Sequence, residues 1–319
     1  MAINKILFFA DIVTVLPKNV CKNNYLLLKG VSILNSTAYM IIFKKADDLD
    51  FYLKEVKKEG KKIGFVPTMG ALHAGHLSLI EQSKHQTDIT VCSIFVNPTQ
   101  FNNKEDFQKY PITIEKDIDA LCSVECTILF FPDVTEIYPS SHNKKQYDLG
   151  LIETLLEGHY RSGHFQGVCE VVDRLLEIVN PDLLFLGQKD YQQCMVLKKM
   201  LQLTGRGNEV ELIIAETVRE ENGLAMSSRN LRLSSEEKEK ATVIYKSLLH
   251  IKENINNKSF LQLAEYGQQQ LESQGFVVDY VSIANADTLQ PAQTRSEPLV
   301  VLIAATLNSI RLIDNMLLN

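Results

Sequence analysis

The sequence predicts an α/β protein, with a Rossmann-like parallel sheet that carries helices on both faces and a smaller C-terminal α+β domain. Two observations lead to this fold class. Short apolar, β-branched runs alternate with longer helical patterns, which is typical of right-handed crossovers between parallel strands. Beyond about Thr217 the alternation stops, and two helical patterns are followed by strand-like runs. We therefore expect two domains of different construction.

The first domain is expected to span residues 40–216. Its strands are predicted at residues 63–66, 89–96, 126–131, 183–186 and 210–214, and its helices at residues 77–85, 114–123, 168–179 and 191–203. In parallel sheets of this kind the ligand binds beyond the carboxyl ends of the strands. Thr68, Asn97, Gly187 and Thr217 all follow predicted strands. We expect these four residues to meet at one edge of the sheet.

The second domain is expected to span residues 217–319. The string that begins at Ser234 is typical of a helix N-terminus and predicts a helix over residues 235–255, followed by another over residues 261–273. Strand-like runs come next, at residues 277–283 and 299–303. The charge-rich stretch 236–240 is expected to be a solvated helix face.

Residues 1–39 fit neither domain. Apolar residues at positions 6–10 are interrupted by Asp11, and no small-residue cleavage site follows at the expected distance, which argues against a signal peptide. Two interpretations stay open. The segment is either a poorly ordered N-terminal arm or the product of a start codon chosen too far upstream.

The composition is that of a soluble enzyme. The chain has 319 residues, 45% of them hydrophobic, which is enough for one large core or two modest ones. Its net charge of -6 argues against nucleic acid as the main partner, and no apolar run approaches the ~20 residues that cross a bilayer. The cysteines lack a disulfide framework spacing, which favours reduced thiols in the cytoplasm: Cys21, Cys92, Cys122, Cys126, Cys169 and Cys194.

The segment from Pro67 to His76 reads PTMGALHAGH and lies between a predicted strand and a predicted helix. Backbone N–H groups at a helix N-terminus carry partial positive charge and bind phosphate oxygens, and Gly70 and Gly75 allow close backbone approach. His73 is three residues before His76, so both imidazoles lie on the same side of a helical turn. The segment is therefore predicted to bind a polyphosphate.

The histidine pair also has two other interpretations. A histidine near a helix start is often a surface or capping residue, and two histidines three apart can be half of a metal site. Zinc needs three or four ligands, and neither the cysteines nor the other histidines show a matching spacing: His85, His142, His159, His164 and His250. The strand, turn and helix context favours phosphate.

The same segment resembles the HxGH signature of the nucleotidylyl-transfer superfamily, and the longer string is similar to that of the pantothenate synthetase (pantoate–β-alanine ligase) family. Over residues 40–319 other stretches resemble that family in order and approximate spacing: Asn97-Pro-Thr-Gln100, His164-Phe-Gln-Gly-Val168, Gly187-Gln-Lys189-Asp190-Tyr-Gln-Gln193 and Met226-Ser-Ser-Arg229. The family's opening strand corresponds to Met40-Ile-Ile-Phe. Where the family usually has an acidic residue the chain has Gln188, a change that we expect to be tolerated.

The resemblance implies an ATP-dependent condensation of (R)-pantoate with β-alanine to pantothenate, AMP and diphosphate, through a pantoyl adenylate. The implied catalytic residues are His73, His76, Lys189, Ser227, Ser228 and Arg229. The implied ATP-binding residues are Met69, Gly70, Ala71, Leu72, His73, Ala74, Gly75, His76, Gly187, Gln188, Lys189, Asp190, Val218, Met226, Ser227, Ser228 and Arg229. The second domain would form a lid over the nucleotide, and the chain would be a homodimer.

Gln100, Gln193 and Asn97 are the implied substrate-binding residues. A neutral amide donates and accepts hydrogen bonds, so glutamines can bind the hydroxyl and carboxylate groups of pantoate without burying a competing charge. A surface position is the alternative for both glutamines. Mg²⁺ is expected with ATP, for which the sequence identifies no protein ligand.

Two other functions stay open. A different small-molecule adenylyltransferase of the superfamily would share the histidine pair, although it gives no reason for Gln100, Gln193 and the MSSRN string together. A non-catalytic ATP-binding module would not need His76 and Lys189.

Overall fold

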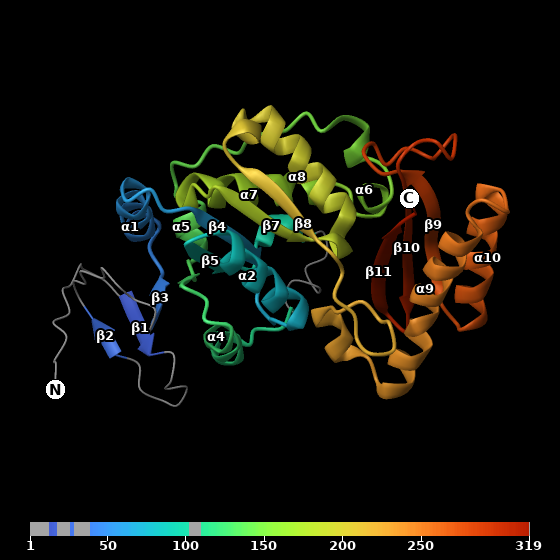
Figure 1. The fold of residues 1–319 in the computed structure, drawn as a ribbon, viewed down its shortest axis with the longest axis horizontal. Helices are drawn as coiled ribbons and strands as arrows, with labels where there is room; N and C mark the ends of the chain where they lie inside the picture. Colours follow the sequence, from blue (N-terminus) through green and yellow to red (C-terminus); the bar gives the residue numbers. More distant parts are fainter. Residues whose placement is uncertain (1–12, 18–25, 29–38, 102–109, 319) are drawn as a thin grey trace.

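The computed structural model describes residues 13–17, 26–28, 39–101 and 110–318. The chain forms an eight-stranded sheet with strand order β2-β1-β3-β6-β5-β4-β7-β8, and a three-stranded sheet with order β11-β10-β9. In Figure 1 the smaller sheet and its helices lie at the opposite end of the molecule from β1 and β2. The predicted α/β architecture with a smaller C-terminal α+β domain is confirmed.

Six neighbouring strands of the large sheet are parallel. In chain order they are β3 (Tyr39–Phe43), β4 (Ile63–Thr68), β5 (Ile89–Ile94), β6 (Ile128–Phe130), β7 (Leu183–Gly187) and β8 (Glu211–Ala215). The connecting helices are α1 (Ala46–Lys58), α2 (Ala74–Gln86), α4 (Ile114–Ser123), α5 (Val134–Ile137), α6 (Glu157–Tyr160), α7 (His164–Val179) and α8 (Tyr191–Leu203).

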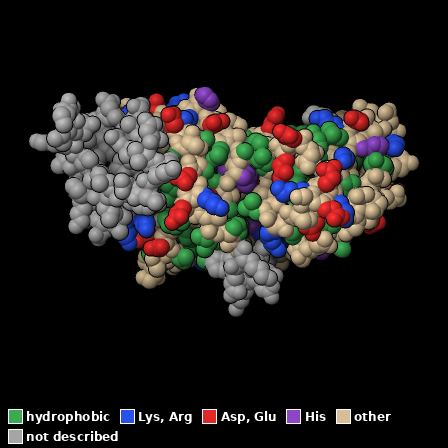
Figure 2. All heavy atoms as spheres, turned by 90° about the horizontal axis from the view of Figure 1, so that it is seen from below, with side chains coloured by type: hydrophobic (Ala, Val, Ile, Leu, Met, Phe, Trp, Pro, Cys, Tyr) green, Lys and Arg blue, Asp and Glu red, His purple; other side chains and the backbone are tan. Residues whose placement is uncertain are grey.

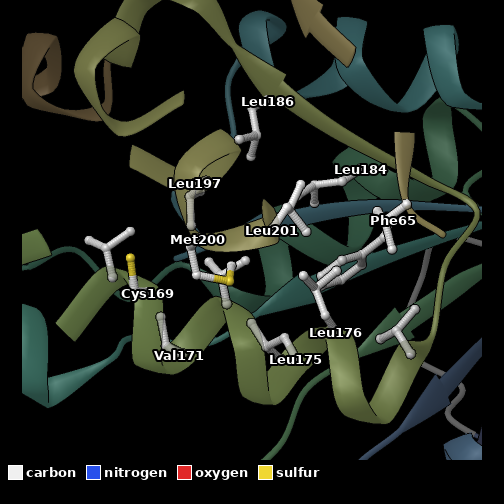
Figure 3. Close-up of a cluster of buried hydrophobic side chains, with 14 of the residues drawn as sticks. Phe65, Cys169, Val171, Leu175, Leu176, Leu184, Leu186, Leu197, Met200 and Leu201 are labelled. Atoms are coloured by element: carbon white, nitrogen blue, oxygen red, sulfur yellow. The ribbon is translucent and has the colours of Figure 1, made fainter. Parts of the chain in front are cut away.

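Both faces of this sheet are apolar. Successive side chains of a strand point to opposite faces, and in β6 Ile128 and Phe130 join the core under α1, α7 and α8, whereas Leu129 joins the core under α2 and α4. Figure 3 shows the first of these cores, where Leu176 on α7 and Leu201 on α8 lie close to strand side chains. Strands buried on both faces read as continuous apolar runs, which is why they could be recognised in the sequence.

The second domain contains α9 (Ser235–Asn254), α10 (Phe260–Ser273) and the antiparallel strands β9 (Val277–Asn285), β10 (Leu299–Leu307) and β11 (Ile310–Leu317). Along β10, Val301 and Ile303 pack with α9 and α10, whereas Val300 and Leu302 join the core of the first domain. The small sheet therefore lies between its own helices and the first domain, as Figure 1 shows.

Three differences from the predicted elements matter for the site. Helix α2 begins at Ala74 instead of residue 77, and α7 begins at His164 instead of residue 168. The sequence indicates no third strand in the second domain, where β11 carries the buried polar pair Asp314 and Asn315. A polar pair interrupts the apolar alternation by which a strand is recognised.

We also predicted no element before Met40. The structure has β1 (Val13–Pro17) antiparallel to β3, and β2 (Leu26–Leu28) antiparallel to β1. These strands extend the sheet at the edge of β3. The unpaired backbone N–H and C=O groups of an edge strand can pair with a further strand whose sequence shows no recognisable side-chain pattern. The remainder of residues 1–38, including Cys21, lies outside the described residues, and the domain limits stay predictions.

Candidate active site

A cavity of about 270 Å³ lies beyond the carboxyl ends of four parallel strands. Thr68 ends β4, Gly187 ends β7, Asn97 follows β5 and Thr217 follows β8, and all four line the cavity. The prediction that they meet at one edge of the sheet is therefore confirmed. On the face drawn in Figure 2, histidine and basic side chains lie near the middle of the molecule.

Most of the predicted site residues line this one cavity: Met69, His73, Gly75, His76, Asn97, Gln100, Gly187, Lys189, Asp190, Gln193, Val218, Met226, Ser227, Ser228 and Arg229. Gly70, Ala71, Leu72, Ala74 and Gln188 are not among the described residues that line it. Segments far apart in the sequence thus converge, because parallel strands place their following loops on the same edge.

The two histidines form the N-terminal cap of α2. His73 is the N-cap residue, and its Nδ1 accepts a hydrogen bond from the backbone N–H of Gly75 at 3.2 Å. Nδ1 of His76 accepts from the backbone N–H of His73 at 3.4 Å, and the ring centroids are 4.0 Å apart. This capping box explains why the helix begins three residues earlier than predicted. A neutral imidazole that accepts at Nδ1 carries its proton at Nε2, so both rings are Nε2–H donors.

The cavity keeps both histidines uncharged. Burial lowers the pKa of His73 to about 4, with a further contribution from the positive charge of Lys189. Burial also lowers the pKa of His76 to about 3, and His73 and Lys189 add to this effect. At neutral pH the pair therefore offers hydrogen-bond donors without adding to the positive charge of the site.

The backbone donors of the turn are already used by the protein. The buried carboxylate of Asp117, in the first turn of α4, accepts from the N–H groups of Ala71 at 3.0 Å and Leu72 at 2.8 Å. The N–H group of Gly70 donates to Thr68 Oγ1 at 3.3 Å. The expected phosphate contacts of these three N–H groups thus compete with internal partners. An aspartate in a first helical turn is common, so no sequence pattern indicates this role of Asp117.

Lys189 lies in a short 3-10 turn, Gln188–Asp190, between β7 and α8. Its Nζ atom is 3.5 Å from Asp190 Oδ1. Burial raises the pKa of Asp190, but the positive charges of Lys189 and Arg229 outweigh this and hold the pKa below its usual value. Asp190 is therefore ionised at neutral pH and lies beside the lysine at the cavity wall.

A hairpin places the Ser227–Arg229 loop at the cavity. The N–H group of Met226 donates to Val218 O at 2.9 Å, and Ser227 Oγ caps the following 3-10 helix by accepting from Arg229 N at 3.3 Å. Gly223 turns this hairpin with φ of +91°, and a Cβ atom there would lie 2.2 Å from the Tyr245 ring. Glycine is required at this position for both reasons.

The other end of the cavity holds interlocked amides. Asn97 Nδ2 donates to Gln100 Oε1 at 3.3 Å and to Gly167 O at 3.1 Å, and its Oδ1 accepts from Tyr138 Oη at 3.0 Å. Gln100 Nε2 donates to Met69 Sδ at 3.0 Å. Both amide hydrogens of Asn97 are thus used inside the protein.

His164 fixes the backbone of this loop, with Nδ1 2.8 Å from Gln100 O. Burial lowers the pKa of His164 to about 4, and Arg161 adds to the effect. The side chain of Gln193, on α8, reaches the cavity and has no hydrogen-bond partner within the described ranges. It is thus available to a ligand. Tyr110, Glu157 and Arg161 also line the cavity, and no motif had indicated them.

The described residues contain no group of three or more His, Cys, Asp or Glu side chains placed to bind a metal ion. The five described cysteines are free and buried, in agreement with reduced core thiols. Among the helices in the described ranges, none has the length and apolar character required to cross a membrane.

A family model described as pantoate-beta-alanine ligase matches residues 41–317. The chain belongs to the pantoate–β-alanine ligase family. The pantothenate synthetase of Cytophaga hutchinsonii is 44% identical over 285 residues, which are 88% of this chain and 99% of that protein. The pantothenate synthetase of Neisseria meningitidis is 42% identical over 266 residues, 83% of this chain and 95% of that protein.

Solved structures agree with this family. The pantothenate synthetase of Thermus thermophilus has a TM-score of 0.81 and 38% identity, covering 86% of this chain and 98% of that one. The pantoate–β-alanine ligase of Francisella tularensis has a TM-score of 0.74 and 36% identity, covering 87% of this chain and 97% of that one. That structure is described as a complex with β-γ ATP and β-alanine. The family's activity is a C–N bond-forming ligase reaction, and the cavity is its candidate active site.

Proposed function

We propose that this cavity joins pantoate to β-alanine with ATP, yielding pantothenate, AMP and diphosphate. One observation carries the proposal. Two neutral Nε2–H donors, His73 and His76, line the same cavity as Lys189 and the Ser227–Arg229 loop, at the carboxyl edge of the sheet. Such an array can stabilise negative charge on a triphosphate without a covalent intermediate.

The first step is adenylation. A carboxylate oxygen of pantoate attacks the α-phosphorus of ATP, and the bond to the β-phosphate oxygen breaks as diphosphate leaves. Negative charge grows on the oxygen that bridges the α- and β-phosphates and leaves with diphosphate. We assign the stabilisation of this charge to Lys189 and His76, and the binding of the departing phosphates to Ser227, Ser228 and Arg229, because all five line the cavity. The product is a pantoyl adenylate.

The second step is acyl transfer. The uncharged amine of β-alanine attacks the activated carbonyl, the C–O bond to AMP breaks, and the amine's proton is released. AMP is a good leaving group, so the protein's contribution is orientation of the two reactants. No serine or cysteine nucleophile is required.

Pantoate recognition is assigned to the end of the cavity that is formed by Asn97 and Gln100, here called the amide end, and to Gln193 on α8. Gln193 is free to bind a hydroxyl or carboxylate group, and Gln100 retains one amide hydrogen after its bond to Met69. Asn97 has no amide hydrogen left for substrate. We therefore assign Asn97 the task of orienting Gln100, in place of the direct substrate contact expected from the sequence.

Mg²⁺ would enter with ATP. It prefers phosphate oxygens and water. Glu157, Asp190, Glu216 and Asp314 line the cavity, but within the described residues they form no cluster of three or more metal ligands, which fits a cation held mainly by the nucleotide. We also propose a cytoplasmic homodimer. Light scattering on the purified chain tests the dimer, which a monomer mass would contradict.

AMP formation tests the function. The chain with ATP, Mg²⁺, pantoate and β-alanine should release one AMP per pantothenate formed, and omission of either acid should abolish AMP accumulation. No AMP with the full mixture would contradict the ligase and support a silent ATP-binding module. Adenylate transfer to a mononucleotide or to phosphopantetheine, but not to pantoate, would indicate another adenylyltransferase.

A further inference from the structure

Asn315 of β11 binds the turn that carries Lys189. Its Nδ2 group donates to Gln188 O and to Lys189 O, each at 2.9 Å, and its Oδ1 accepts from Gln188 Nε2 at 3.2 Å. Asn315 is 2% exposed, and both of its amide hydrogens are used on two consecutive carbonyls. The bonds cross from the second domain to the first, over 126 and 127 positions of sequence.

Asp314, the neighbouring residue of β11, binds the hairpin that precedes the Ser227–Arg229 loop. The carboxylate of Asp314 pairs with Arg219 through two hydrogen bonds, at 2.6 and 3.1 Å, and also accepts from Asn315 N at 2.8 Å. Arg219 lies in the hairpin that leads to Ser227, where it bridges to Ala225. Two adjacent strand residues thus hold two of the three segments that are proposed to contact the phosphates.

We propose that Asn315 is a positioning residue for Lys189, an inference that rests on the proposed role of that lysine in adenylation. A lysine ammonium group sits on a flexible four-carbon stem, so its position is defined only where the backbone that carries the stem is held in place. Misplacement of a charge-stabilising group by about 1 Å can cost on the order of 10²-fold in rate. Asn315 removes this freedom by fixing the carbonyls of residues 188 and 189.

This arrangement gives Gln188 a specific purpose. A glutamine donates through Nε2 to Asn315 Oδ1, which a carboxylate at this position cannot do. Because Nδ2 of Asn315 is occupied by the two carbonyls, its oxygen must face residue 188. In this chain the glutamine at position 188 therefore has a hydrogen-bond partner in Asn315.

The test is a double-mutant cycle on pantoate-dependent exchange of diphosphate into ATP. Asn315→Ala should lower kcat by about tenfold to about 10²-fold with the KM for ATP almost unchanged. In a Lys189→Ala background the same substitution should change kcat less than about twofold, because the group that it positions is gone. Equal losses in both backgrounds would show a general structural effect and overturn the proposal.

A matched control removes a different bond between the domains. Tyr160 Oη donates to Asp279 O at 2.5 Å, and Tyr160 is not among the described residues that line the cavity. Tyr160→Phe should leave kcat unchanged. Gln188→Ala, which keeps both carbonyls bound to Asn315, should cost less than Asn315→Ala and serves as the second variant if the latter does not fold.

Hydrogen–deuterium exchange separates this inference from the proposed function. Asn315→Ala should accelerate exchange in the peptide covering residues 187–193, and Tyr160→Phe should not. No acceleration would overturn the positioning role whatever the activity. If the unsubstituted chain does not exchange diphosphate into ATP in the presence of pantoate, the proposed function is wrong. The rate of hydrogen–deuterium exchange in the peptide covering residues 187–193 then still shows whether Asn315 fixes the turn.

Discussion

The two ends of the cavity hold their polar groups in different ways. At the phosphate end His73 and His76 are fixed through Nδ1 by backbone N–H groups, which leaves their Nε2–H groups for a ligand. At the amide end Asn97 and Gln100 bind each other and their surroundings through uncharged amide groups. The first arrangement presents hydrogen-bond donors to developing negative charge, and the second holds neutral amides in fixed positions for the hydroxyl and carboxylate groups of a substrate. We expect substitutions at the two ends to affect different steps.

The largest effect is expected at the phosphate end. His76→Ala or Lys189→Ala should each lower pantoate-dependent diphosphate exchange by roughly 10²-fold, as for the loss of one preorganised donor. The matched control is His85→Ala, which changes an exposed histidine of the same helix. Near-normal exchange by either folded variant would remove that residue from the mechanism.

At the amide end the effect should be on binding. Gln193→Ala should weaken pantoate binding by about 1–3 kcal/mol because substrate groups lose their partner in a closed site, with ATP binding almost unchanged. Calorimetric titrations with ATP, and with pantoate in the presence of a non-hydrolysable ATP analogue, measure both. Gln202→Ala, on an exposed position of the same helix, is the control. An equal loss of affinity for ATP and for pantoate would show that Gln193 does not act on pantoate specifically.

A smaller effect on pantoate affinity should follow when one of the hydrogen bonds that hold the Asn97 side chain is removed. Tyr138→Phe removes the hydroxyl that donates to Asn97 Oδ1, and the net worth of such a bond is about 0.5–1.5 kcal/mol. If Asn97 orients Gln100, pantoate affinity should fall several-fold while diphosphate exchange at saturating pantoate is retained. Unchanged affinity would leave Asn97 with a purely structural role.

The smallest effect on activity is expected from pH. The pKa values of His73 and His76, about 4 and about 3, lie below the ordinary value of 6.5, so neither ring should gain a proton between pH 8 and 6. Between pH 6.5 and 4 the unfolded chain takes up protons that the folded chain does not, so the free energy of unfolding should fall as pH falls. Urea denaturation across this range measures it, and His76→Gln should flatten the slope. A slope unaffected by that substitution would contradict the low pKa of His76.

The features that the sequence predicts are local patterns, whereas the features that it does not predict are contacts between residues far apart in the chain. Strands buried on both faces and the PTMGALHAGH segment are local patterns, and they located the sheet and the histidine pair. Asp117 and Asn315 act on loops 45 or more positions away, and Tyr138 reaches Asn97 across 41 positions. These contacts exist only after the elements pack, so no spacing could indicate them. The sequence suggests that the backbone N–H groups of Ala71 and Leu72 bind phosphate. Their actual partner, the carboxylate of Asp117, is too distant in the sequence to be recognised from a local pattern.

The exchange of labelled diphosphate into ATP, measured with pantoate and without β-alanine, shows whether this cavity forms a pantoyl adenylate. The donors of His76 and Lys189 are proposed to complete adenylation before the amine enters, so exchange should depend on pantoate and proceed in the absence of β-alanine. Addition of β-alanine should divert the adenylate to pantothenate. Exchange that requires β-alanine, or that proceeds equally well without pantoate, would contradict the two-step account of this cavity.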